Sequence, residues 1–147
     1  MNARSKSRSA ARLAAVQALY QRQREDTPLA KLLDEFHQHR LGREIEDAQY
    51  EKADIAFFDD VVSGVVARQE EIDTLLGERL AEGWRLERLD KTLLQILRAG
   101  TYELLARADV PTRAAISEYL DVVHAFFDQG DVRFANGVLD AVAKAVR

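Results

Sequence analysis

The sequence predicts an all-α protein built as a bundle of six to seven helices. Apolar residues recur at helical spacing nearly throughout the 147 residues, and no segment shows the strict alternation of a half-buried strand. The length and the hydrophobic fraction of 47% suit one compact domain over residues 1–147, with a basic N-terminal arm at residues 1–9. No run of 18 apolar residues occurs, so we expect no membrane-spanning helix and a cytoplasmic protein.

The first two helices are indicated by composition and by a capping signal. Residues from about Ser9 to Arg24 are rich in strong helix formers and predict the first helix. Thr27 can cap a second, short helix, and Pro28 suits its first position. Residues 38–53 are polar and charged, so they predict a long exposed connection.

A third helical stretch opens at Asp54 and carries an apolar stripe. We expect one break between Arg68 and Glu71 and an end at Gly83 and Trp84. The stripe that should face the core includes Ile55, Phe58, Val61, Val62 and Val65.

The next helix is predicted to be the central one. Asp90 is a capping residue, and the helix should run from about Lys91 to Arg107. Its apolar arc covers about half of its circumference, which is typical of a largely buried helix.

Two helices complete the chain. Pro111 makes residues 109–111 a sharp connector, because the residue before a proline disfavours the helical region. One helix should follow to about Phe127, and Gly130 should stop it. The last helix is expected from about Val132 to Val146.

The charge of the chain is unevenly distributed. The net charge is −4, yet residues 1–24 contain six basic and no acidic side chains. The positive field is therefore confined to the start of the chain. Such a run is either a solvated helix start or an anion-binding arm, for which nucleic acid is the commonest target.

The first helix places its arginines together. At about 100° per residue, Arg8, Arg12 and Arg22 fall within one arc beside an apolar stripe that includes Leu13. Three small residues lie beside and among these arginines: Ala11, Ala15 and Ala18. Their small side chains predict a flat strip on the helix surface that a phosphate backbone can approach closely. Tyr20, at the edge of the stripe, either stacks on an unpaired base or packs in the core.

No catalytic or metal site emerges from the residues. His37 and His39 point to different faces of a helix and cannot chelate one metal ion together. The chain has no cysteine, no phosphate-binding glycine-rich loop and no nucleophile elbow. We therefore expect neither enzymatic activity nor a cofactor or metal.

Seven short segments carry a family resemblance over nearly the whole chain. They are Ala15–Tyr20, Phe58–Val65, Leu97–Arg98, Tyr102–Leu104, Asp109–Pro111, Ile116–Glu118 and Arg133–Asp140. In this order and spacing they resemble the NusB family of bacterial transcription antitermination factors. Each segment alone is a weak signal, whereas the ordered set is specific.

The resemblance implies both a fold and a function. It implies two packed three-helix halves, and a protein that binds RNA without acting as an enzyme. Such proteins pair with NusE, which is also a small-subunit ribosomal protein, and bind the boxA segment of ribosomal RNA transcripts. The pair then helps RNA polymerase to resist premature termination within an antitermination complex. A homodimer is a further state that the resemblance allows.

The resemblance also implies an RNA-binding surface. The family uses its basic start, its first helix and a basic–Phe pair before Asn-Gly, which correspond here to Arg4, Lys6, Arg8, Arg12, Tyr20, Arg133 and Phe134. The predicted helix boundaries independently place Arg133 in the first turn of the last helix, where backbone N–H groups favour phosphate. Phe134 is either a stacking platform or a core anchor.

Two alternatives belong to other functional classes. The same fold occurs as the N-terminal domain of ribosomal RNA cytosine methyltransferases, so the chain could be the targeting module of an enzyme. Its end at Arg147 leaves no room for a cofactor-binding domain, which argues against that alternative. A protein–protein scaffold without RNA contact is the other, and the basic first segment argues against it.

Overall fold

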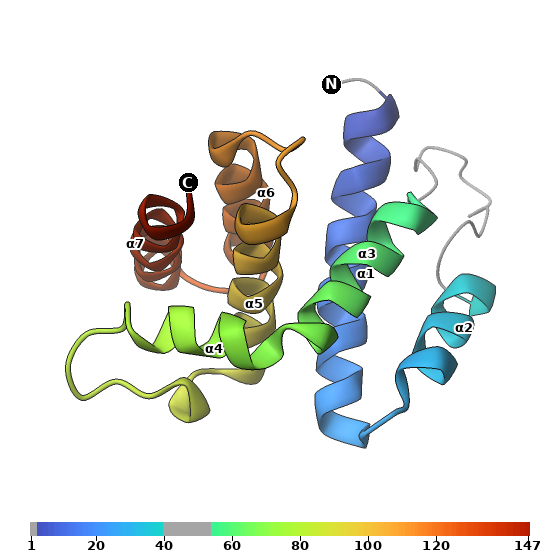
Figure 1. Ribbon diagram of the computed structural model, residues 1–147, viewed down its shortest axis with the longest axis horizontal. Helices are drawn as coiled ribbons and strands as arrows, with labels where there is room; N and C mark the ends of the chain where they lie inside the picture. The colour runs from blue at the N-terminus through green and yellow to red at the C-terminus, as the bar shows by residue number, and fades with distance from the viewer. Residues whose placement is uncertain (1–2, 40–53) are drawn as a thin grey trace. The chain divides into compact units, whose positions relative to one another are not determined.

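The computed structural model describes residues 3–39 and 54–147, which form seven α-helices, one 3-10 turn and no strand (Figure 1). The chain divides into two compact units, residues 1–66 and residues 67–147. The prediction of an all-α protein with six to seven helices is confirmed for the part of the chain described. No helix in these ranges is long and apolar enough to cross a membrane.

The first unit contains three helices: α1 (Ala3–Glu25), α2 (Leu29–His39) and α3 (Ile55–Ala67). Helix α1 begins earlier than the predicted start at Ser9, so most of the basic arm is helical. Helix α2 begins directly after Pro28, as the capping signal indicated. The predicted connection at residues 38–53 begins later than expected, because α2 continues to His39, and residues 40–53 lie outside the described residues.

The core of the first unit contains an aromatic stack between α2 and α3. The rings of Phe36 and Phe58 are stacked with their centroids 5.5 Å apart, and both side chains are buried. Phe57 is also buried, whereas Ile55, which the predicted stripe placed in the core, is 43% exposed. Ile55 is the first residue of α3, where the chain has only just entered the helix.

Helix α1 buries its small residues together with Val16 and Leu19, two members of the predicted stripe. Ala11, Ala15 and Ala18 are fully buried, while Leu13 is 37% exposed. The predicted flat strip of exposed alanines beside the arginines is therefore wrong. The small alanine side chains allow another chain segment to approach this face of α1 closely, so the face is covered and not open to a phosphate backbone.

The second unit contains four helices and a 3-10 turn: α4 (Gln69–Gly77), η1 (Leu86–Arg88), α5 (Lys91–Ala106), α6 (Thr112–Phe126) and α7 (Gln129–Val146). The break near Arg68 is confirmed, and α4 ends at Gly77, before the predicted end at Gly83. The Asp90 carboxylate caps α5 by accepting hydrogen bonds from the backbone N–H groups of Thr92 (2.8 Å) and Leu93 (3.2 Å).

Helix α5 is the centre of the second unit. Every residue from Leu93 to Leu104 is buried, and α6 and α7 both pack on α5 and on each other (Figure 1). The packing is close at Gly100, where an added Cβ would lie 3.1 Å from Leu139 Cδ2. The prediction of a central, largely buried helix is confirmed.

Two charged side chains of α5 are held inside this unit. Glu103 is fully buried and accepts a hydrogen bond from the hydroxyl of Tyr119 on α6. Arg98 donates two hydrogen bonds to the carboxylate of Asp73 on α4, at 2.8 and 2.9 Å. Both residues belong to the segments that carry the family resemblance, and here they act in the packing of helices.

Helix α7 begins earlier than predicted. Its start at Gln129 is capped by Asp128, whose carboxylate accepts a hydrogen bond from the backbone N–H of Asp131 at 3.0 Å. Gly130 therefore lies in the first turn of α7 and does not stop α6. The cap stabilises the helix start by more than a single glycine disfavours it.

Arg147 closes the C-terminal end of α5. Its guanidinium donates hydrogen bonds to the carbonyls of Glu103 (3.1 Å), Leu104 (2.8 Å), Arg107 (2.8 Å) and Val110 (2.6 Å). The last carbonyls of a helix have few intrahelical partners, so a planar donor with several N–H groups satisfies them well.

We expect Arg147→Ala to lower the free energy of unfolding by about 1–3 kcal/mol, because these carbonyls would lose a charged donor. Denaturant titration followed by far-ultraviolet circular dichroism measures this change. Arg147→Lys should recover only part of the loss, since an ammonium cannot reproduce the planar set of donors. Equal stability of all three proteins would show that water replaces the arginine without cost.

Candidate nucleic-acid interface

Two of the predicted RNA-binding arginines converge on one aromatic ring in the first unit. The guanidinium carbons of Arg8 and Arg12 lie 4.6 and 4.9 Å from the ring centroid of Phe57. A cation in this position is attracted by the negative face of the ring, and the attraction is stronger where water is excluded. The buried Phe57 ring therefore fixes the position of both side chains.

The two arginines differ in their access to solvent. Arg12 is only 4% exposed. The Arg8 side chain is 15% exposed, and its Nε lies 3.8 Å from a carboxylate oxygen of Asp54. The backbone N–H of Asp54 also donates a hydrogen bond to the carbonyl of Ser7 at 3.0 Å, which fastens the start of α3 to α1. Arg12 is therefore a packed residue, and not an exposed member of an arginine arc.

The other predicted residues of α1 are Arg4, Lys6 and Tyr20. Lys6 is exposed. Arg4 lies in the first turn of α1, and its side chain is outside the described part of the structure. Tyr20 is half-buried and follows Arg12 by about 12 Å along the helix axis, at a rise of about 1.5 Å per residue. Tyr20 therefore does not join the arginines at Phe57.

The second predicted group, Arg133 and Phe134, lies in the second turn of α7 and not in the first. The helix start carries the carboxylates of Asp128 and Asp131. The backbone N–H of Asp131 lowers the pKa of Asp128, whereas lost hydration and the Asp128 charge raise the pKa of Asp131. Anionic side chains already occupy this end of the helix, so the helix start does not support the predicted phosphate contact of Arg133.

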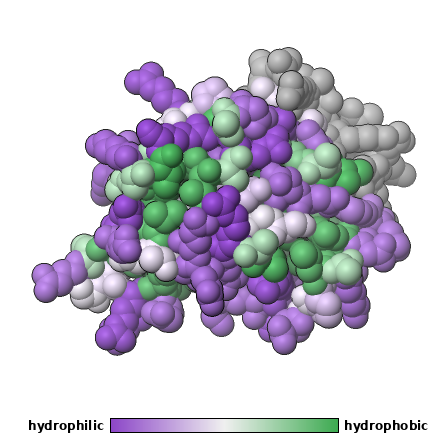
Figure 2. Space-filling model, in the orientation of Figure 1, coloured by the Kyte–Doolittle hydropathy of each residue, from purple (hydrophilic) through white to green (hydrophobic). Residues whose placement is uncertain are grey.

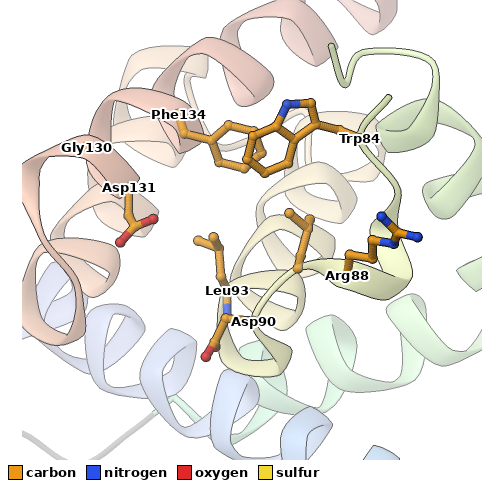
Figure 3. A pocket seen from close by; sticks show the side chains of 8 residues that line it. Trp84, Arg88, Asp90, Leu93, Gly130, Asp131 and Phe134 are labelled. Atoms are coloured by element: carbon orange, nitrogen blue, oxygen red, sulfur yellow. The ribbon is translucent and has the colours of Figure 1, made fainter. Parts of the chain in front are cut away.

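Phe134 stacks on Trp84, which is not among the residues predicted to bind RNA. The rings of Phe134 and Trp84 have centroids 5.5 Å apart and an interplanar angle of 28° (Figure 3). Phe134 is half-buried and Trp84 is 56% exposed. Phe134 is therefore neither a fully buried core anchor nor an isolated surface ring.

The two rings line a pocket of about 370 Å³ in the second unit (Figure 3). Its other lining residues are Arg88, Leu89, Asp90, Leu93, Gly130 and Asp131. One sequence signal could have suggested Trp84: a lone tryptophan directly after a glycine and outside any helix. Gly83 has φ of +88°, a left-handed conformation that favours glycine.

Each unit thus places arginines beside aromatic rings, and one of the rings is open to solvent. Guanidinium groups bind phosphate, and open aromatic faces stack on unpaired bases, so this combination suits single-stranded nucleic acid. Within the described residues, no group of three or more His, Cys, Asp or Glu side chains is placed to hold a metal ion.

Comparison with known proteins assigns the chain to a family. The sequence model of the NusB family matches residues 9–144. A relative named transcription antitermination protein NusB, from Novosphingobium aromaticivorans, is 68% identical over 142 residues, which cover 97% of this chain and 96% of the relative.

Solved structures agree with the sequence comparison. A structure of T. maritima NusB is 30% identical, has a TM-score of 0.77 and covers 93% of this chain and 90% of its own. A structure of the antitermination factors NusB and NusE in complex with dsRNA is 26% identical, with a TM-score of 0.77 and coverages of 95% and 97%. By this match over most of its length, the chain belongs to the NusB family.

Proposed function

We propose that this protein is an RNA-binding transcription antitermination factor that binds the boxA segment of ribosomal RNA transcripts together with NusE. It acts in the cytoplasm, within the RNA polymerase antitermination complex, as a single RNA-binding domain without enzymatic activity or a cofactor. The strongest support is the 68% identity to an antitermination protein over 97% of this chain. The related complex of NusB and NusE with dsRNA supports both the partner and the RNA.

The proposed RNA contacts are the predicted residues other than the buried Arg12. The side chains that we place against RNA are those of Arg4, Lys6, Arg8, Tyr20, Arg133 and Phe134. Arg12 is buried, so its role is to hold the Phe57 ring on which Arg8 also lies. The matched relative is an antitermination protein and not a methyltransferase, which favours an adapter over the targeting module of an enzyme.

Binding of boxA RNA, measured with and without NusE, tests the proposed function directly. We expect tighter binding of boxA RNA than of a shuffled single-stranded RNA, and a further gain when NusE is present. Binding of NusE without any RNA affinity in either mixture would instead identify a protein–protein scaffold.

Salt dependence tests the basic end of α1. Lys6→Ala should flatten the plot of log affinity against log salt by about 0.7, the value for one phosphate contact on a single strand. Because Lys6 is exposed, stability should stay unchanged. Lys31→Ala is the matched control, since Lys31 is an exposed lysine of α2 outside the proposed surface. Equal slope changes in both variants would indicate diffuse charge attraction instead of a defined contact.

A further inference from the structure

Large hydrophobic side chains are exposed at four described positions: Leu13, Ile55, Trp84 and Phe126. The face drawn in Figure 2 shows hydrophobic residues gathered in patches among hydrophilic ones. Trp84 differs from a scattered surface residue, because it stacks on a second ring and lines a pocket. Its position therefore requires an explanation.

The Trp84 ring is held in place by its surroundings. Its backbone N–H donates a hydrogen bond to the carbonyl of Ala81 at 3.0 Å, and the preceding Gly83 turns the chain with φ of +88°. Phe134 covers part of the ring by stacking, yet 56% of the residue stays exposed. A ring fixed in this way loses little conformational freedom when a flat ligand stacks on it.

Cationic groups lie beside this aromatic pair. Arg88 lines the same pocket and makes no ion pair with any described residue. The guanidinium of Arg133 reaches back over the first turn of α7, with Nη2 4.0 Å from the position of a Cβ on Gly130, another lining residue. The carboxylate of Asp90 caps α5. The carboxylate of Asp131 also lines the pocket, on the α7 side. The pocket therefore combines an aromatic surface with guanidinium groups at its edge, and a phosphate is expected on the Arg88 side, away from Asp131.

We propose that Trp84, supported from behind by Phe134, stacks on one unpaired base of the bound RNA, and that Arg88 contacts an adjacent phosphate. This inference rests on the proposed function and adds two RNA-binding residues to it. A volume of about 370 Å³ is at the small end for ligand pockets, which suits one base. An exposed tryptophan can also anchor a protein partner, but the guanidinium groups beside it favour a nucleotide.

Affinity for single-stranded boxA RNA tests the stacking. Trp84→Ala should weaken binding about 5- to 140-fold, the range for losing one base–aromatic stack. Trp84→Phe should keep most of the affinity, because it keeps an aromatic face. Phe126→Ala is the matched control: Phe126 is 57% exposed in the same unit and lies outside this pocket, so its loss should leave affinity unchanged.

Fluorescence gives an independent readout. Trp84 is the sole tryptophan of the chain, so the intrinsic tryptophan emission of the full-length protein reports on this ring. Titration with boxA RNA should quench the emission in proportion to binding. Arg88→Ala should flatten the salt dependence of affinity by about 0.7, whereas Arg113→Ala, at an exposed position of α6, should not.

The outcomes separate this inference from the proposed function. If the wild-type protein binds no RNA with or without NusE, both are overturned. If wild type binds RNA while Trp84→Ala keeps full affinity and the emission of the wild type does not change, only the base-stacking site is overturned. If Trp84→Ala binds RNA normally but no longer binds NusE, Trp84 lies in a protein interface, and the base-stacking site is also overturned. Should Trp84→Ala fail to fold, Trp84→Phe and the quenching experiment decide.

Discussion

Replacing Glu103 by alanine should lower the free energy of unfolding by about 3–5 kcal/mol. Glu103 is fully buried on α5 and accepts the hydrogen bond of the Tyr119 hydroxyl. The substitution leaves a cavity in the centre of the second unit and removes the acceptor of a buried hydroxyl. Urea titration followed by circular dichroism measures the loss.

A double-mutant cycle separates the hydrogen bond from the packing. Tyr119→Phe alone should cost about 1–3 kcal/mol, because it leaves the Glu103 carboxylate without that donor. Glu103→Leu combined with Tyr119→Phe removes both polar partners, and it should cost clearly less than the sum of Glu103→Leu alone and Tyr119→Phe alone. Purely additive costs would show that the two side chains do not interact.

Arg12→Ala should lower the free energy of unfolding by about 2–4 kcal/mol. Arg12 is 4% exposed, and its guanidinium carbon lies 4.9 Å from the ring centroid of the buried Phe57. Its long aliphatic stem and its charge over the ring are both part of the packing of the first unit. The same change at Arg24, an exposed arginine near the end of the same helix, should alter stability by no more than about 0.5 kcal/mol.

The same variants distinguish a packing role from direct RNA contact. Arg12→Lys keeps the charge but loses the planar guanidinium. If Arg12 has a packing role, the Arg12→Lys protein should therefore also be less stable than the wild type. For a direct phosphate contact, Arg12→Ala would instead flatten the salt dependence of RNA binding with unfolding free energy unchanged. That result would contradict the conclusion that Arg12 acts through packing in the first unit.

Local sequence signals were sufficient to predict the order of the helices and the positions of several helix ends. The Asp90 cap and the break at Arg68 depend on neighbouring residues in the chain, and both occur where they were predicted. The buried position of α5 was also predictable, because an apolar arc over half of a helix requires neighbours on several sides. The start of the last helix was predicted wrongly, because Asp128 caps α7 at Gln129 and Gly130 lies within its first turn.

The sequence by itself therefore determined an all-α fold, a basic first helix and the resemblance to one family. The tertiary structure decided which side chains of that helix reach solvent, because packing buried Arg12 and the alanines and left Leu13 exposed. It also decided that Phe134 meets Trp84, a residue far away in the chain. Helical periodicity gives the face on which a side chain lies, but not the surface that packs against that face. Burial and ring contacts depend on that second surface, so they become known only when the chain is folded.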